Sequence, residues 1–250
     1  ECPELFELPI DGDENNKKWI LYGGSGEYLI GDFDGKMFNS ETGQIPFHSG
    51  NCFYASQTFN NIPKEDGRRI QIAWGRVAMP DMPFNQMMLF PVTLRLQTTE
   101  DGPRMFAEPI REIEQIHRRK RQWKNKTLKP GDNLLSSLSG ELFHIQAELQ
   151  VDDVEETGFV IRDVPIVYNV TKQQLSCQKK TASLKPVNGT IRLEILVDRT
   201  SIEIFGNKGR VYMPMGVLIA DNSKSLEIFT KGGNTQVESL VVYKLGSVWR

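Results

Sequence analysis

The side chains of this sequence that could do chemistry are mainly acidic residues beside strands rich in aromatic residues. Its histidines, His48, His117 and His144, are isolated, with no HExxH or other paired spacing, so the sequence predicts no metal site. A Ser/His/Asp triad remains an alternative, although no GxSxG pattern marks a nucleophile. Gly23-Gly24-Ser25-Gly26 lacks the Gly-Lys-Ser/Thr ending of a phosphate-binding loop and is interpreted as a hairpin turn. Acidic groups next to aromatic strands favour a sugar-binding cleft.

Composition and charge argue against several other classes of function. The 250 residues include 30 Lys and Arg against 32 Asp and Glu, so no strong overall charge favours nucleic acid or an acidic membrane. No apolar run reaches the roughly 18 residues of a membrane-spanning helix. Cys2, Cys52 and Cys177 show no CxxC spacing, which favours free, buried thiols, with one disulfide as the alternative. Neither a metal nor an organic cofactor is expected.

The elements that must position these groups are short strands. Segments rich in β-branched and aromatic residues recur with turn residues between them, and no helical period of useful length separates them. This pattern predicts an all-β fold, either a sandwich, a barrel or a propeller. The expected strands of the first part are Lys18–Tyr22, Tyr28–Phe33, Phe53–Phe59, Arg69–Trp74 and Met87–Leu96.

The character of the sequence changes between Glu108 and Lys129. A dense basic run, residues 117–121, follows isoleucines at a spacing of three, which predicts a short amphipathic linker helix within Arg111–Lys126. Binding of nucleic acid by this run is the alternative, and the absence of interleaved aromatic residues argues against it. We therefore expect a first domain over residues 1–108, a linker over 109–130 and a second domain over 131–250.

The second domain is expected to be a two-sheet sandwich. In Ile191–Val197 every second residue is apolar, which predicts one buried and one solvated face, and Ile202 and Ile204 repeat this alternation after a turn. The expected strands are Phe143–Val151, Gly158–Arg162, Ile166–Val170, Ile191–Val197, Ser201–Phe205, Leu226–Phe229 and Val237–Tyr243.

Six segments resemble, in order, the motifs of one family. They are Glu1–Phe6, Tyr28–Gly35, Phe53–Phe59, Asp66–Trp74, Met82–Leu94 and Val197–Phe205. The first is similar to Glu-Cys-Pro-Asp-Leu-Phe, the third to Phe-Tyr-Ala-x-Gln-Thr-aromatic, and the last to Val-Asp-Arg-Ser-Ser-Val-Glu-Val-Phe. Together they resemble glycoside hydrolase family 32, the family of invertases, inulinases and levanases.

This resemblance implies a fold and a reaction. The fold would be part of a five-bladed β-propeller followed by a C-terminal β-sandwich. Glu1 would be the general acid/base of a retaining hydrolysis of β-fructofuranosides such as levan, inulin or sucrose, because the leaving oxygen must gain a proton as its bond breaks. Contacts with the substrate are expected from Cys2, Tyr54, Gln57 and Trp74, with packing in the core as the alternative for the last three.

Other polar residues near these motifs are expected to have supporting roles. Asp32 and Asp34 are predicted to shape a turn before Gly35 rather than to do chemistry. His48 is interpreted as a structural or exposed loop residue. Glu4 is expected to be a carboxylate that supports the site from behind the residues that contact the substrate.

The sequence also departs from the family. The Asn-Asp-Pro-Asn motif with the nucleophilic aspartate and the Arg-Asp-Pro motif of a middle blade do not occur in it. We therefore expect that N-terminal blades of the same enzyme lie outside this chain, which would be inactive alone. The polymeric substrate favours a secreted, periplasmic or cell-envelope location. The alternatives are a non-catalytic carbohydrate-binding sandwich and a fructosyltransferase, in which a sugar replaces water as the acceptor.

Overall fold

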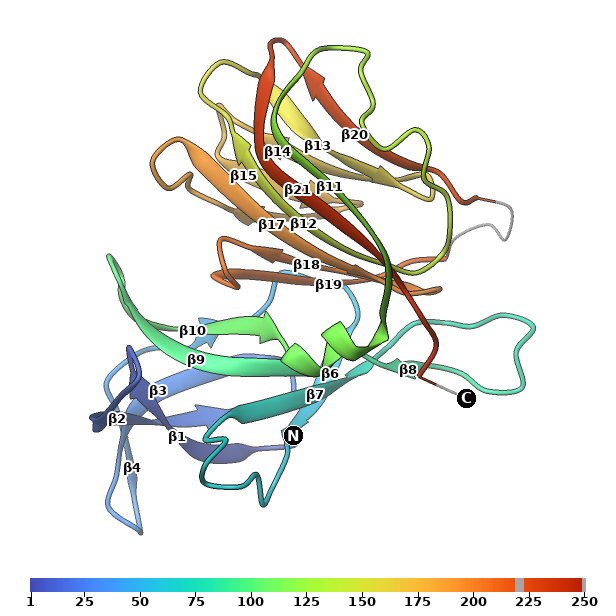
Figure 1. Cartoon of the computed structure of the whole chain (residues 1–250). Coiled ribbons are helices and arrows are strands. Elements are labelled where there is room, and N and C mark those ends of the chain that lie inside the picture. The colour runs from blue at the N-terminus through green and yellow to red at the C-terminus, as the bar shows by residue number, and fades with distance from the viewer. Residues whose placement is uncertain (219–222, 249–250) are drawn as a thin grey trace.

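The computed structural model describes residues 1–218 and 223–248, and strands dominate the chain in two stacked parts (Figure 1). The N-terminal part contains one curled sheet of ten strands. The C-terminal part contains a sheet of six strands and a sheet of five strands that face each other. The predicted fold class, all-β with part of a β-propeller followed by a sandwich, is confirmed.

The N-terminal sheet consists of two four-stranded antiparallel meanders, which are two blades of the propeller. A single parallel pair, Ile10 with Leu96, joins them. The first blade contains β1 (Glu4–Ile10), β2 (Asp13–Tyr22), β3 (Glu27–Phe33) and β4 (Phe38–Ser40), and β5 (Ile45–Pro46) pairs with β3. The second contains β6 (Phe53–Thr58), β7 (Arg69–Gly75), β9 (Val92–Thr99) and β10 (Gly102–Pro109), and β8 (Met87–Met88) pairs with β7.

Turn chemistry sets the register within these blades. The Asp34 carboxylate accepts hydrogen bonds from the backbone N–H groups of Lys36 (2.8 Å) and Met37 (2.7 Å), and Gly35 between them has a φ of +93°. The prediction that Asp34 shapes this turn is confirmed. The same prediction for Asp32 is wrong: it lies on the preceding strand, β3, where it forms an exposed ion pair with Lys18 at 3.2 Å.

The predicted linker helix is wrong beyond Ile116. A 3₁₀ helix, η1 (Arg111–Ile116), is followed at once by β11 (His117–Leu128), which pairs antiparallel with β21 at one edge of the six-stranded sheet. Nearly all side chains of β11 are exposed or half-buried, so this strand lacks the alternation by which strands are recognised. Lysine and arginine are common on edge strands because they discourage pairing with another chain. The domain limits at residues 108 and 130 remain a prediction.

The C-terminal part is a sandwich of two antiparallel sheets. The six-stranded sheet has the order β11-β21-β12-β17-β18-β19, and the five-stranded sheet has the order β16-β15-β14-β13-β20. The strands not yet given are β12 (Phe143–Gln150), β13 (Glu156–Ile161), β14 (Val164–Asn169), β15 (Gln174–Cys177), β16 (Lys180–Ser183), β17 (Thr190–Val197), β18 (Ser201–Gly206), β19 (Val211–Gly216), β20 (Leu226–Lys231) and β21 (Thr235–Leu245). All seven predicted strands of this part are present.

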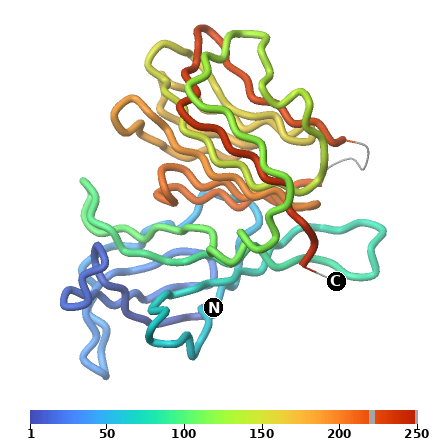
Figure 2. The backbone as a smooth tube through the Cα atoms, viewed as in Figure 1, coloured from blue at the N-terminus to red at the C-terminus, as the bar shows by residue number. Residues whose placement is uncertain are grey.

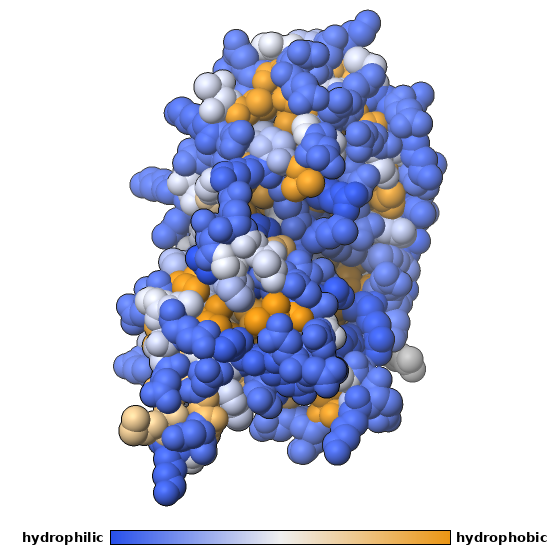
Figure 3. Space-filling model, turned by 90° about the vertical axis from the view of Figure 1, so that its left-hand side faces the viewer, coloured by the Kyte–Doolittle hydropathy of each residue, from blue (hydrophilic) through white to orange (hydrophobic). Residues whose placement is uncertain are grey.

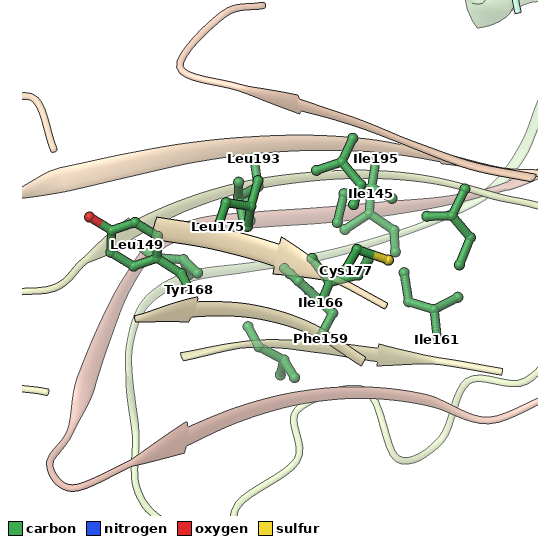
Figure 4. Close-up of a cluster of buried hydrophobic side chains, with 14 of the residues drawn as sticks. Ile145, Leu149, Phe159, Ile161, Ile166, Tyr168, Leu175, Cys177, Leu193 and Ile195 are labelled. Atoms are coloured by element: carbon green, nitrogen blue, oxygen red, sulfur yellow. The ribbon is translucent and has the colours of Figure 1, made fainter. Parts of the chain in front are cut away.

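The core of the sandwich fills the space between its two sheets (Figure 4). Ile145 and Ile195 of the six-stranded sheet and Phe159 and Tyr168 of the five-stranded sheet are fully buried. Cys177 lies among these side chains, and Cys2, Cys52 and Cys177 are all free thiols, as predicted. Cys52 and Cys177 are buried as expected, whereas Cys2 is exposed.

The sandwich packs directly on the propeller blades (Figure 2). Leu196, Phe205 and Tyr212 of the six-stranded sheet belong to the same apolar cluster as the side chains between the blades. The loop before β6 runs along β19: Ser49 N–H donates to Tyr212 O at 2.8 Å, and Asn51 N–H donates to Pro214 O at 3.1 Å. On the side of the molecule shown in Figure 3, small apolar patches lie near the boundary between the sandwich and the blades, among mostly hydrophilic residues.

Candidate active site

Glu1 is held against the second blade by its side chain and its backbone. Its carboxylate atom Oε2 accepts a short hydrogen bond from the Tyr54 hydroxyl. Its backbone oxygen accepts from Gly24 N–H at 2.8 Å, and the oxygen of Gly24 accepts from Ala55 N–H at 2.7 Å. The first residue is therefore tied both to the turn between β2 and β3 and to β6.

A β-bulge in β6 decides which of its side chains face outward. The pairing of β6 with β7 shifts register between Tyr54 and Gln57, where Ala55 has a φ of 45°. The extra residue lets both Tyr54 and Gln57 point away from the core, while Phe53 and Ser56 are buried. Core packing, the alternative given for Tyr54 and Gln57, does not occur, because Tyr54 is half-buried and Gln57 is exposed.

Glu4 links β1 to β6, the strand that carries Tyr54. Both of its carboxylate oxygens accept from Thr58 N–H at 2.9 Å, and one also accepts from the Thr58 hydroxyl at 2.8 Å. Because β1 and β6 are not neighbours in the sheet, this side chain replaces the backbone ladder between them. Glu4, expected to support the site, thus links β1, which follows Glu1, to β6, which carries Tyr54.

Aromatic and apolar side chains extend from Tyr54 across the blade. Tyr54 is the cross-strand partner of Trp74, and their rings lie 6.0 Å apart, centre to centre, at 65°. Trp74 pairs in turn with Met88 of β8, and the two side chains are 38% and 54% exposed. Trp74 is therefore not a core residue, and its exposed ring can pack against the C–H face of a sugar.

Arg76 is a member of this group that the sequence reasoning missed. Its guanidinium carbon lies 4.3 Å from the centre of the Tyr54 ring, in cation–π geometry. Counting in steps of two along β7 from Trp74 could have placed Arg76 on the same face. Met88 was also missed as a site residue, although it lies in the expected strand Met87–Leu96, which the structure divides into β8 and β9.

The electrostatics keep Tyr54 as a hydrogen-bond donor to Glu1. The hydrogen bond to the Glu1 carboxylate, helped by partial burial and the nearby negative charge, raises the pKa of Tyr54, and the positive charge of Arg76 acts in the opposite direction. The phenol therefore stays protonated at neutral pH and holds Oε2 of Glu1.

The remaining predicted site residues lie beside this group. Cys2 is exposed and has a φ of 45°, which turns the chain between Glu1 and β1. Gln57 is exposed beyond the bulge. Within residues 1–218 and 223–248, neither side chain hydrogen-bonds to Glu1, Tyr54 or Trp74, so their expected contacts with substrate stay predictions.

His48 is a structural residue, as the sequence indicated. Its Nδ1 accepts from Gly50 N–H at 3.2 Å, which leaves the proton on Nε2, 3.3 Å from Ser25 O. Burial lowers the pKa of His48 to about 4, so the ring is neutral at neutral pH. Its ring lies 4.5 Å from that of Phe53, just before Tyr54, and it therefore supports the loop that leads into β6.

A groove of about 340 Å³ on the six-stranded sheet is another hollow that could bind a ligand. Its polar lining includes Glu194 and Lys208 and the ion pair of Arg192 with Glu148 at 2.9 Å. The aromatic ring in its lining, Phe205, is only 1% exposed, so it offers no stacking surface for a sugar. This groove does not include Glu1 and has no constellation comparable to that of Glu1, Tyr54 and Trp74.

Two further observations on the described residues concern membrane spans and metal ligands. None of their helices is long and apolar enough to cross a membrane. Across residues 1–218 and 223–248 there is also no group of three or more His, Cys, Asp or Glu side chains arranged to hold a metal ion.

The fold and site define an all-β protein in which propeller blades carry an acidic and aromatic group and pack on a sandwich. The sequence matches the family model "Glycosyl hydrolases family 32 N-terminal domain" over residues 1–109. It matches "Glycosyl hydrolases family 32 C terminal" over residues 112–244. The chain therefore belongs to glycosyl hydrolase family 32.

Individual relatives agree with this assignment. A levanase of Bacillus subtilis (strain 168) is 34% identical over 100% of this chain, which spans 43% of that protein. An extracellular exo-inulinase of Aspergillus awamori is 24% identical over 100% of this chain and 55% of its own length. The crystal structure of exo-inulinase from Aspergillus awamori superimposes with a TM-score of 0.85 at 22% identity, over 100% of this chain and 57% of that one, which shows the shared fold. The chain spans only about half the length of these relatives, or less.

Proposed function

We propose that this chain is the part of a retaining β-fructofuranosidase that carries the general acid/base, Glu1. The observation that supports this proposal most directly is the position of Glu1 in a family 32 chain. Its carboxylate is held by the Tyr54 hydroxyl next to an exposed tryptophan. A carboxyl group beside an aromatic surface can protonate the leaving oxygen of a sugar packed on that surface.

In the proposed mechanism the two oxygens of Glu1 have different roles. Tyr54 holds Oε2, so Oε1 can carry the proton that passes to the leaving oxygen as the glycosidic bond breaks. A second carboxylate, on polypeptide outside these 250 residues, attacks the anomeric carbon from the opposite face and forms a fructosyl-enzyme. Glu1, now ionised, takes a proton from water, which releases fructose with its configuration retained.

The proposed substrates are β-fructofuranosides such as levan, inulin or sucrose. The similarity to a levanase favours a fructan as the substrate. The exposed side chains of Trp74 and Met88 form a surface that can contact more than one sugar unit. Cys2, Tyr54, Gln57 and Trp74 are the proposed contacts with the substrate. The reaction uses two carboxyl groups and needs no cofactor. An extracellular relative supports an exported location.

The proposal is tested by joining this chain to N-terminal blades that carry the nucleophilic aspartate. We expect the joined protein to release fructose from levan, inulin and sucrose, and NMR should detect β-fructofuranose as the first anomer. Release of the α-anomer first would contradict retention, and the absence of any fructoside cleavage would contradict the proposed function. Accumulation of longer fructosides at the expense of free fructose would identify a fructosyltransferase.

Replacing Trp74 by alanine is expected to weaken substrate binding. An aromatic contact is worth about 1 kcal/mol, so KM for fructan oligosaccharides should rise roughly five- to tenfold, with a smaller change in kcat. Trp19→Ala is the control, because Trp19 packs on Phe33 (5.2 Å between ring centres) in the first blade, away from the Tyr54 group. An unchanged KM for Trp74→Ala in steady-state kinetics would remove Trp74 from the binding surface.

A further inference from the structure

Glu203 is a buried carboxylate where the sandwich meets the propeller blades. It lies on β18, all six residues of which are buried, and its side chain is 0% exposed. Ile202 and Ile204 face the core of the sandwich, whereas Glu203 and Phe205 face the blades. A buried carboxylate is expensive compared with an apolar side chain of the same size, so packing alone does not account for a glutamate here.

Each carboxylate oxygen of Glu203 accepts a hydrogen bond from a different partner. Oε1 accepts from Phe90 N–H at 2.8 Å, in the segment between β8 and β9. Oε2 accepts from the Tyr212 hydroxyl at 2.6 Å, on the neighbouring strand β19. Within the described residues no lysine or arginine forms an ion pair with Glu203, and the Phe90 N–H and the Tyr212 hydroxyl are its hydrogen-bond donors.

The first hydrogen bond leads to Trp74. Phe90 directly follows Leu89, whose N–H donates to Ala73 O at 2.9 Å, next to Trp74. The strand β8 ends one residue earlier and pairs with Trp74 and Gly75. A second contact from the sandwich, the hydroxyl of Thr200 on the sulfur of Met87 at 3.2 Å, holds the same short strand.

The second hydrogen bond leads to Tyr54. The ring of Tyr212 stacks on Phe205 (4.9 Å, 15°) and meets the ring of Phe53 edge-on (6.1 Å, 89°). Phe53 immediately precedes Tyr54, the donor to Glu1. The close passage of the same loop beside β19 requires Gly50, since a Cβ there would lie 2.1 Å from Pro214 O.

We propose that Glu203 is a positioning residue that ties the sandwich to both strands carrying Tyr54 and Trp74, and so sets the Tyr54 hydroxyl against Glu1. This inference rests on the proposed function for its effect on activity, but its geometry does not. Two diverging donors require two acceptor oxygens, which a carboxylate has and an amide side chain lacks. In this proposal the sandwich supports the site structurally through these contacts. A carbohydrate-binding role of the sandwich would not require them.

The test compares two buried tyrosines. Tyr212→Phe removes the hydroxyl that reaches Glu203, and Tyr168→Phe removes a hydroxyl that donates to Leu184 O at 2.9 Å within the core of the sandwich. In the joined enzyme we expect Tyr212→Phe to lower kcat/KM on levan about tenfold, because small displacements of catalytic groups are costly. The kcat of Tyr168→Phe should stay within about twofold of wild type, although both variants lose thermal stability.

Amide hydrogen exchange tests the geometry without any activity. Glu203→Gln in this chain should speed amide exchange at Phe90, whose N–H donates to Glu203, and at Ala55, which follows Tyr54. Amide exchange in β13 and β14 should not change. If the Gln variant does not fold, Tyr212→Phe provides the same measurement for Ala55.

The two measurements separate the possible failures. Equal kcat/KM values for Tyr212→Phe, Tyr168→Phe and wild type would overturn the positioning role, while the proposed function would stand as long as Glu1→Gln strongly lowers kcat/KM on levan. If the wild-type joined enzyme cleaves no fructoside, the proposed function fails. Unchanged exchange at Phe90 and Ala55 would then overturn the tie as well.

Discussion

Glutamine in place of Glu1 should lower kcat/KM on levan and sucrose by about 10²–10⁴-fold, the usual contribution of a general acid or base. The amide can still accept the hydrogen bond from Tyr54, so the local geometry should survive. It cannot supply a proton to the leaving oxygen or take one from water. Steady-state kinetics of the joined enzyme measure this loss.

Leaving-group dependence identifies the role of Glu1 more sharply than the loss itself. An aryl β-fructofuranoside with a good leaving group needs little protonation, so its first step should be nearly as fast in Glu1→Gln as in wild type. Glu7→Gln is the matched control, because Glu7 is exposed on β1, the strand that follows Glu1. Undiminished hydrolysis of levan by Glu1→Gln would show that another group is the acid.

The second large effect concerns the pH dependence of stability. Burial raises the pKa of Glu203 to about 7, against the favourable hydrogen bonds from Tyr212 and Phe90. A carboxyl group with a raised pKa in the folded state binds its proton more tightly there than in the unfolded chain. Its stabilising effect is therefore complete below about pH 4.5 and is lost as the pH rises through about 7. The expected loss is about 3 kcal/mol in the free energy of unfolding.

Other titratable groups also change the free energy of unfolding over this pH range. The contribution of Glu203 must therefore be read from the difference between wild type and a variant. His48, whose pKa is lowered to about 4, destabilises the fold as the pH falls from about 6.5 to about 4. Asp66 and Glu112, whose pKa values arginine contacts lower to about 2, act only at more acidic pH. Tyr212, Cys52 and Asp198 are the titratable groups around Glu203, and burial raises the pKa values of Tyr212 and Cys52, so both stay neutral.

Urea unfolding from pH 4.5 to 8 should show the contribution of Glu203 when wild type is compared with Glu203→Gln. The free-energy difference between the two should shrink or reverse as the pH rises through 7, since only wild type acquires a buried charge. Glu227→Gln, an exposed change on β20, should run parallel to wild type. A pH-independent difference for Glu203→Gln would show that Glu203 keeps one protonation state over this range.

Much of the fold could be predicted because strands that bury one face have a local signature. Alternation in Ile191–Val197 and turn residues around Asp34 depend on residues that are close in the chain, and the expected strands are present, except that Met87–Leu96 is divided into β8 and β9. The motif that begins at Glu1 located the candidate acid in the same way. The bulge at Ala55, which the sequence did not indicate, places both Tyr54 and Gln57 away from the core.

The predictions that failed share one physical cause. The pattern of apolar residues in a strand does not show what packs against the second face or the edge of that strand. The strand β11 looks like a solvated helix because it is an exposed edge, and its place is set by β21, more than 100 residues away. In β18, the face expected to be wet is sealed by the propeller, and Glu203 meets Phe90 there across 113 residues. Arg76 and Met88 likewise join the candidate site only through packing between strands. The positions of the strands, the family and the candidate acid follow from patterns within short segments of the sequence. The packing of the sandwich on the propeller blades depends on contacts between distant segments, which no single segment encodes.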